Sequence, residues 1–265
     1  MLPYKIDAVV LAGGESSPAV MQATGQARRA NIKIGEHSML EHVINALNDS
    51  GTIGSIIVIG DVNAPNCVVL EEGRTMIDNL MKGLLKLRSA KGDGDQRFAL
   101  IATCDIPFLT SESINDFVQR AIEARASLCY PIIPMDLCRT KYGSFKRTSL
   151  RVKEGEFTGG NIMLVDIDVM LTQRSMIERS FAARKNLFRI ASILGPAFLF
   201  RLIVSRLVTP KALNLRLLET AVTNFIGATA RAIVTLYAEI GTDIDKFEDV
   251  RAAIELSQAQ SIINR

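Results

Sequence analysis

Short apolar runs alternate along the chain with longer segments in which apolar residues recur every three or four positions. The runs have the length and composition of buried strands, and they cover residues 6–11, 55–60, 67–70, 99–104, 127–133, 162–165 and 232–237. The intervening segments have the spacing of amphipathic helices, and they include 38–50, 75–87, 111–126 and 247–262. This alternation predicts an α/β fold with a mostly parallel central sheet that helices cover on both faces.

One carboxylate stands at the end of the most conspicuous apolar run. Asp105 follows the strand-like stretch 99–104 and is followed by Ile106-Pro107 and a helix-start signal at Thr110. In open parallel sheets, ligands collect at the carboxyl ends of strands, so the position favours a functional role for this acid. A role as a simple turn residue stays open, because Asp is common before Pro in loops.

A double glycine ends the first predicted strand. Gly13 and Gly14 allow the backbone to approach a ligand closely, and inward-pointing N–H groups of such a loop can bind phosphate oxygens. The polar segment from Glu15 to Asn31 has no clear periodicity, so it is interpreted as a long functional loop. A tight turn without a ligand is the competing interpretation for the glycines.

Beyond the last alternating strands, residues 175–226 have the pattern of several helices. The most apolar part is 194–208, but Arg201 and Arg206 interrupt it, so it is too short for a membrane span. Three interpretations stay open for this helix: packing on the domain, which is favoured; an oligomer contact, as in a homodimer; and a basic helix at a lipid surface, which is the least favoured.

Composition narrows the class of protein. With 265 residues, of which 48% are hydrophobic and 22% charged, the chain can bury a large core. The net charge of +3 and the pI near 8.7 are too mild to indicate nucleic-acid binding. The cysteines, scattered with no CxxC pair, favour free thiols in a reducing cytoplasm, and no signal peptide precedes the first strand. His37 and His42 are interpreted as surface residues.

Several stretches, in order along the chain, resemble the MobA-like NTP transferases of the nucleotidyltransferase superfamily. Leu11-Ala12-Gly13-Gly14 is similar to the opening LAGG, and Gly35 with Met39-Leu40-Glu41-His42-Val43 to the glycine and ML-x-x-V helix that follow. Cys104-Asp105-Ile106-Pro107 is similar to the D-x-P segment, and residues 243–250 to the C-terminal DxDxxED element. The resemblance implies one GT-A/Rossmann-like three-layer sandwich over residues 1–265, with a helical insertion at about 175–226.

The resemblance also implies a reaction and its residues. It implies Mg²⁺-dependent transfer of a nucleotide from an NTP to a small phosphorylated acceptor, such as a sugar phosphate, a molybdopterin-type cofactor or an alcohol phosphate, with release of pyrophosphate. Asp105 and Asp245 would hold the metal, with Asp243 in reserve, and Arg29 would complete the catalytic set. The nucleotide would be bound by the end of the first strand with its glycine loop, by the start of a helix and by the end of the Asp105 strand, namely by Leu11, Ala12, Gly13, Gly14, Asn79 and Thr103.

The acceptor is expected on the C-terminal side of this site. Thr158-Gly159-Gly160-Asn161 is similar to the G-x-N segment that contacts the acceptor in sugar-phosphate nucleotidyltransferases, which assigns Gly160 and Asn161 to acceptor binding. Cationic side chains would hold its phosphate, and the candidates are Lys146, Arg147 and Lys185. A solvated charged turn is the competing interpretation for the first two. An ionised acceptor phosphate requires no general base.

The phosphate loop departs from the family pattern. Glu15-Ser16-Ser17-Pro18 lacks the arginine of S-x-R-M-G, and the place of the phosphate-bridging lysine falls on Arg29, with Lys33 nearby. Arginine keeps the charge but differs from lysine in geometry. Two alternatives therefore stay open: a nucleotide-binding protein without turnover, and a GT-A glycosyltransferase that uses a nucleotide-sugar. The second would normally carry D-x-D, whereas Asp105 is followed by Ile106-Pro107.

Overall fold

A mixed sheet forms the centre of the computed structural model, which describes residues 5–90, 97–183, 192, 195–207 and 209–263. Within these residues nine strands form the sheet, in the order β5-β4-β1-β6-β10-β7-β9-β8, with β11 paired to β7. The strands are β1 Ile6–Leu11, β4 Ile53–Ile59, β5 Val68–Leu70, β6 Phe98–Thr103, β7 Leu128–Pro134, β8 Leu150–Val152, β9 Gly155–Gly159, β10 Ile162–Asp166 and β11 Ala230–Val234. Strands β2 (Lys33–Ile34) and β3 (His37–Ser38) form a separate hairpin.

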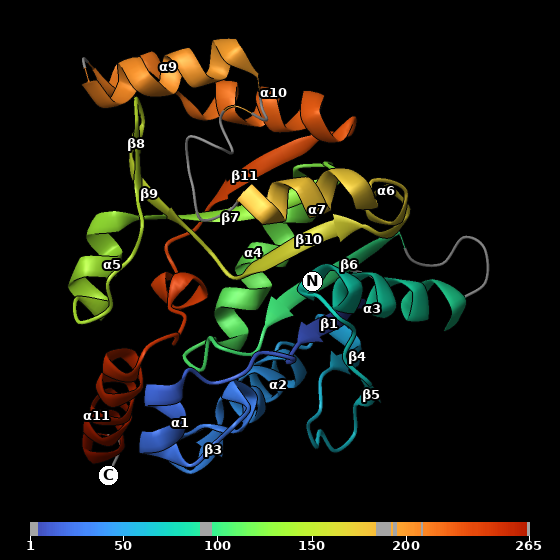
Figure 1. The fold of residues 1–265 in the computed structure, drawn as a ribbon, viewed down its shortest axis with the longest axis vertical. Helices are drawn as coiled ribbons and strands as arrows, with labels where there is room; N and C mark the ends of the chain where they lie inside the picture. Colours follow the sequence, from blue (N-terminus) through green and yellow to red (C-terminus); the bar gives the residue numbers. More distant parts are fainter. Residues whose placement is uncertain (1–4, 91–96, 184–191, 193–194, 208, 264–265) are drawn as a thin grey trace.

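Helices pack on both faces of the sheet and around its ends (Figure 1). The α-helices are α1 Pro18–Thr24, α2 Met39–Asp49, α3 Met76–Ala90, α4 Ser111–Glu123, α5 Met135–Tyr142, α6 Ile167–Thr172, α7 Arg174–Ala183, α9 Pro196–Leu207, α10 Leu215–Ile226 and α11 Phe247–Ile263. Short 3₁₀ turns lie at η1 Arg29–Asn31, η2 Pro210–Ala212 and η3 Ala238–Gly241. The predicted α/β three-layer class is confirmed.

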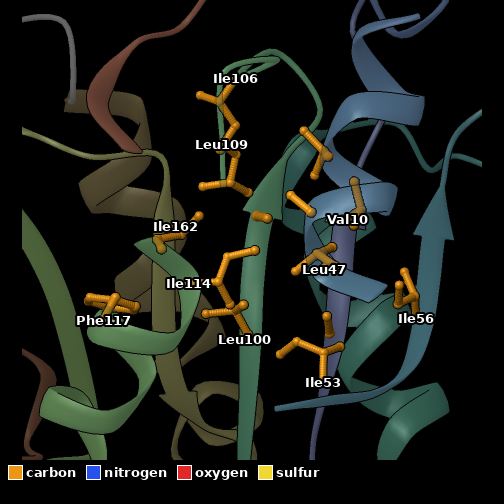
Figure 2. Close-up of a cluster of buried hydrophobic side chains, with 14 of the residues drawn as sticks. Val10, Leu47, Ile53, Ile56, Leu100, Ile106, Leu109, Ile114, Phe117 and Ile162 are labelled. Carbon is orange, nitrogen blue, oxygen red and sulfur yellow. The ribbon is translucent and has the colours of Figure 1, made fainter. Parts of the chain in front are cut away.

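Alternate residues of the central strands pack into two hydrophobic cores, one on each face of the sheet. Val10 of β1 and Leu100 of β6 pack on one face of the sheet against α2 and α4, where Leu47, Ile114 and Phe117 meet them (Figure 2). The residues between them on the strands face α3 and α6 on the opposite side. Because both faces are covered, β1 is apolar at almost every position rather than alternating, which is the run seen in the sequence.

Helix α3 lies unusually close to the sheet at Gly83. A Cβ atom at this position would lie 2.5 Å from Cγ1 of Val9 and 2.9 Å from Cδ1 of Ile59. We expect Gly83→Ala to lower the free energy of unfolding by about 1–2 kcal/mol, because overpacking outweighs the better helix propensity of alanine. Urea denaturation measures the change. Leu85→Ala, on the exposed face of the same helix, is the control and should change stability by less than about 0.5 kcal/mol.

Only part of the sheet is parallel. Strands β5, β4, β1 and β6 run parallel to one another, whereas β10 is antiparallel to both β6 and β7. Only two residues separate β9 from β10, so these strands run in the same direction along opposite edges of β7, and both are antiparallel to it. The predicted parallel order therefore holds for the half of the sheet that carries the glycine loop and Asp105.

The prediction of a continuous loop from Glu15 to Asn31 was wrong. Residues 18–24 form α1, with the side chain of Ser17 accepting a hydrogen bond from Val20 N and Pro18 at the start of the helix. Ser-Pro is a helix-start signal that the sequence analysis passed over, because seven residues are too few to show a period. A second helix, α5, was also missed, and the last strand begins at Ala230 rather than at residue 232.

The predicted helical insertion contains α7, α9 and α10. Helix α9 packs against β8 through Phe198 and Leu202, whose side chains are buried, so the favoured interpretation of packing on the domain is confirmed for that face. Its other face exposes Phe200 and Leu207. None of the helices in the described residues combines the length and the apolar character needed to cross a membrane.

Candidate functional site

One backbone hydrogen bond joins the two distant acidic segments of the chain. Ile244 N donates to the carbonyl oxygen of Asp105 over 2.8 Å, and the side chain of Ile244 is buried in the core beside α11. This contact places the neighbouring acids, Asp243 and Asp245, next to the end of strand β6. The sequence analysis expected Asp105 and Asp245 at one site, and the fold brings them together.

A single guanidinium group lies between these carboxylates. Nη1 of Arg29 is 3.3 Å from Oδ2 of Asp105 and also forms an ion pair with Oδ1 of Asp245. Both acids therefore contact the same nitrogen atom, although they lie 140 positions apart in the sequence. Asp105 and Asp245 are thus close enough to share one cation, and in the described structure that cation is the arginine.

The glycine loop holds Arg29 in this position. Its backbone N–H donates to the carbonyl of Gly14 over 3.0 Å, and Ser16 N donates to Ala27 O, so the ends of the segment that contains α1 are tied together. A Cβ atom on Gly14 would lie 2.7 Å from Nη2 of Arg29. Glycine at this position therefore lets the guanidinium pack directly against the loop backbone.

Asp105 is largely buried at the end of strand β6. Its side chain is 14% exposed, and Oδ1 is buried with no hydrogen-bond partner among the described residues. Burial raises the pKa of Asp105, and the guanidinium of Arg29 opposes that shift. Burial also raises the pKa of Cys104, to about 12, so its thiol stays neutral and is a poor nucleophile.

A cavity of about 560 Å³ opens on the glycine-loop side of Arg29. Most residues predicted to bind the nucleotide line it, namely Leu11, Gly13, Gly14, Asn79 and Thr103. Ala12 does not; its side chain is buried beneath the loop. Asn79 accepts a hydrogen bond from Gly73 N, so part of its polar capacity serves the loop that follows β5. Its predicted contact with base or ribose remains a prediction.

The same cavity contains charged residues that the sequence analysis missed. Arg28 forms an ion pair with Glu72 at 2.6 Å, and Arg74 lies beside them in the lining. Neither arginine belongs to a recognised motif, and the adjacency of Arg28 to Arg29 was the only available signal. Three arginines thus line the cavity, and two of them, Arg28 and Arg29, form ion pairs with carboxylates. A polyanionic ligand would replace those carboxylates as their partners.

A second cavity, of about 770 Å³, opens on the other side of the Arg29 ion pairs. The predicted acceptor-binding residues Lys146, Arg147, Gly160 and Asn161 all line it, together with Asp243 and Asp245. Because Arg29 and Asp105 line the first cavity and Asp245 lines the second, the two cavities adjoin at the ion pairs. Lys185 lies outside the described residues.

Arg147 is a buried cation with spare hydrogen-bond donors. Its side chain is 4% exposed, and Nη1 contacts Oδ1 of Asp243 over 3.4 Å. Nε and Nη2 are buried without a partner among the described residues. Burial lowers the pKa of Arg147, and Asp243 counteracts the shift. Leaving guanidinium donors unpaired is costly, so the arrangement is typical of a site that an anionic ligand completes.

Gly160 and Asn161 connect the strands around the site. Gly160 N donates to Pro131 O, Asn161 N donates to Ile240 O, and Asn161 O accepts from Thr103 N at the end of β6. A Cβ atom on Gly160 would lie 2.7 Å from both Ile240 and Pro131. The motif therefore has a structural role in addition to any contact that it makes with a ligand.

Neither histidine lines the two cavities. His37 is exposed, as predicted, whereas His42 is half-buried, with Nε2 2.8 Å from the carbonyl oxygen of Ile34. In the described part of the chain, no group of three or more His, Cys, Asp or Glu side chains could hold a metal ion by itself. A cation at Asp105 and Asp245 would therefore need further ligands from water or a substrate.

Comparison with known proteins agrees with this architecture. Residues 8–140 match the family model described as the MobA-like NTP transferase domain. A hypothetical transferase from Thermus thermophilus is 31% identical with a TM-score of 0.77, and the alignment covers 93% of this chain and 99% of that one. A search of curated proteins gave no match.

Two further structures are similar in fold. The 2-C-methyl-D-erythritol 4-phosphate cytidylyltransferase from Thermus thermophilus is 14% identical, with a TM-score of 0.52 and coverage of 96% of this chain and 99% of that one. A nucleotidyl transferase from Methanothermobacter thermautotrophicus is 15% identical, with a TM-score of 0.56 and coverage of 97% and 99%. At these identities the likeness concerns the fold alone.

Proposed function

Because the chain belongs to the MobA-like NTP transferase family and is a nucleotidyltransferase, we propose that it transfers a nucleotidyl group from an NTP to a small phosphorylated acceptor. The observation that carries this proposal is the meeting of Asp105 and Asp245 at Arg29, at the junction of the two cavities. The NTP occupies the cavity beside the glycine loop, and the acceptor occupies the one that contains Arg147.

The carboxylates at the junction fit a magnesium ion. Mg²⁺ in such enzymes is usually bound by one or two carboxylates together with phosphate oxygens of the substrate. Asp105 and Asp245 supply that set, and Oδ1 of Asp105 is a buried acceptor atom without a partner among the described residues. When bound there, the metal would neutralise charge on the triphosphate.

The chemistry requires two anions to approach each other. An oxygen of the acceptor phosphate attacks the α-phosphorus and forms a new P–O bond, while the bond from that phosphorus to the bridging oxygen breaks and pyrophosphate leaves with the electron pair. The acceptor phosphate is already ionised, so no side chain must remove a proton. The protein lowers the barrier by orienting the reactants and offsetting their negative charge.

Arginines on either side of the junction supply that charge. Arg29 and its neighbour Arg28 line the NTP cavity, where the backbone of Gly13 and Gly14 lets phosphates approach closely. Binding of an NTP and a divalent cation would move the Arg29 guanidinium from the two aspartates onto phosphate oxygens. Arg147 holds the phosphate of the acceptor on the other side.

The same proposal covers the whole chain. We treat residues 1–265 as one nucleotidyltransferase domain that carries the helices of about 175–226 as an insertion. All four cysteines are free, and three of them are buried, which supports a reducing cytoplasmic location.

Pyrophosphate release tests the function. Purified protein is mixed with each of the four NTPs, Mg²⁺, and sugar phosphates, alcohol phosphates or molybdopterin in turn, and pyrophosphate is measured by a coupled assay. We expect release with one NTP when a suitable acceptor is present. If NTPs bind but no pair yields pyrophosphate, and Arg29→Lys restores turnover, the wild-type chain is a nucleotide-binding protein and the proposal is wrong.

A further inference from the structure

An apolar cavity of about 440 Å³ lies beside the acceptor cavity. One wall is helix α10, whose residues Leu215, Leu218 and Val222 lie on a single face at helical spacing. The opposite wall comes from β8 and β9, through Leu150, Val152 and Phe157. The cavity is therefore enclosed by aliphatic and aromatic side chains of elements that are far apart in the sequence.

The protein does not fully cover the apolar face of α10. None of the residues of α10 reaches full burial, although Leu215 and Leu218 pack at the edge of the apolar cluster beneath α9. The acidic residue in the lining, Glu219, is already satisfied, because its Oε1 accepts a hydrogen bond from Ala232 N over 2.9 Å. Arg231 also lines the cavity, and its Nη1 lies 3.9 Å from Oε2 of Glu219. Apart from this ion pair, the cavity offers mainly apolar surface to a ligand.

This cavity and the acceptor cavity share part of their lining. Tyr130, Thr148, Thr158 and Gly159 line both. The acceptor cavity also contains Arg147, whose Nε and Nη2 are buried without a partner among the described residues. A polar cavity that contains a buried arginine thus borders an apolar one along these shared residues.

We propose that the acceptor is amphiphilic: its phosphate binds at Arg147 and its hydrocarbon part lies in the cavity between α10 and strands β8 and β9. This inference rests on the proposed function for the identity of the phosphate site, and it narrows the acceptor to alcohol phosphates with an apolar chain. A sugar phosphate would leave the apolar cavity empty. The helical insertion then has a definite role, because α10 forms one wall of the binding site.

Binding measurements without any NTP test this inference separately from catalysis. Methyl phosphate and hexyl phosphate are titrated into the full chain by isothermal calorimetry. Each buried methylene group strengthens binding roughly fourfold, so we expect hexyl phosphate to bind at least about 50-fold more tightly than methyl phosphate. A preference of less than about fivefold would overturn the inference, even if the enzyme released pyrophosphate with other acceptors.

Matched variants locate the site. Leu218→Gln should weaken hexyl phosphate binding about tenfold or more and leave methyl phosphate unchanged, whereas Thr220→Gln, at an exposed position of the same helix, should change neither. Val222→Phe fills the cavity with an apolar side chain and should also weaken hexyl phosphate binding, which covers the case in which glutamine disturbs folding. Equal effects of the substitutions at residues 218 and 220 would contradict the inference.

Titration with hexanol tests whether the apolar cavity binds the hydrocarbon part of the acceptor or an unrelated apolar ligand. If the phosphate and the chain belong to one ligand, Arg147→Met should weaken hexyl phosphate binding strongly, and hexanol should bind far more weakly than hexyl phosphate. If hexanol binds as tightly as hexyl phosphate and Arg147→Met has no effect, the cavity serves another ligand and the inference is wrong. If turnover is absent but the pattern for the two phosphates holds, only the proposed function fails.

Discussion

Replacing Asp105 by asparagine is expected to lower the rate of pyrophosphate release by roughly 10³-fold, the scale seen when one preorganised electrostatic contact at a reacting centre is removed. Asparagine keeps the shape of the side chain but removes its charge. The cation site then retains Asp245 alone, and Arg29 loses one of its two acidic partners. Steady-state kinetics at saturating NTP and varied Mg²⁺ measure the loss.

The control for this prediction is the same substitution at another buried aspartate. Asp166 is 4% exposed, accepts hydrogen bonds at the start of α6 and forms an ion pair with Arg97. It lies beside the first residue of strand β6, at the opposite end of that strand from Asp105. Asp166→Asn should lower stability and leave the turnover number of the folded enzyme unchanged. A folded Asp105→Asn protein that kept more than a tenth of the wild-type rate would remove Asp105 from the proposed mechanism.

The second large effect is expected at Arg147. Arg147→Met should raise the KM for the acceptor about 100-fold, because it removes a buried guanidinium whose free donors would bind the acceptor phosphate. The dissociation constant of the NTP, which binds in the other cavity, should change less than twofold. Initial-rate measurements with varied acceptor and equilibrium titration of the NTP separate these two quantities.

Two further variants distinguish anion binding from a structural role of Arg147. Arg147→Lys keeps a positive charge beside Asp243 but lacks the planar fork, so the KM should rise by an intermediate factor. Lys146→Met, which changes the exposed neighbour in the same cavity, should raise the KM less than about fivefold. If the lysine variant of Arg147 behaves as wild type while the methionine variant only loses stability, the arginine serves the fold alone.

Local patterns were sufficient for most of the framework. Strand β1 was predicted at its exact bounds, because a strand covered on both faces is almost continuously apolar. Helix α2 begins at Met39, directly after its predicted start at Ser38, which forms a capping box with Glu41. These features depend on residues a few positions apart. Short elements such as α1 and α5 were missed for the corresponding reason: seven or eight residues show too little periodicity to be recognised.

The candidate site was predictable only in its parts. A motif resemblance identified Asp105, Asp245 and Arg29 individually, but no local pattern indicates that one guanidinium nitrogen lies between the two acids. From the sequence, Arg147 and Lys146 were equally good candidates for binding the acceptor phosphate. Tertiary packing distinguished them, since it buried one side chain and left the other exposed.

The sequence by itself determined most of the longer strands and helices and which acids follow strand ends, because hydrophobic periodicity and capping act over single turns and strands. Only the tertiary structure decided that Ile244 bonds to the backbone of Asp105 and that α10 encloses an apolar cavity beside Arg147. The Ile244–Asp105 contact and the facing of α10 by β8 and β9 join residues more than fifty positions apart. Their geometry depends on how whole elements pack against the sheet, which no local pattern records.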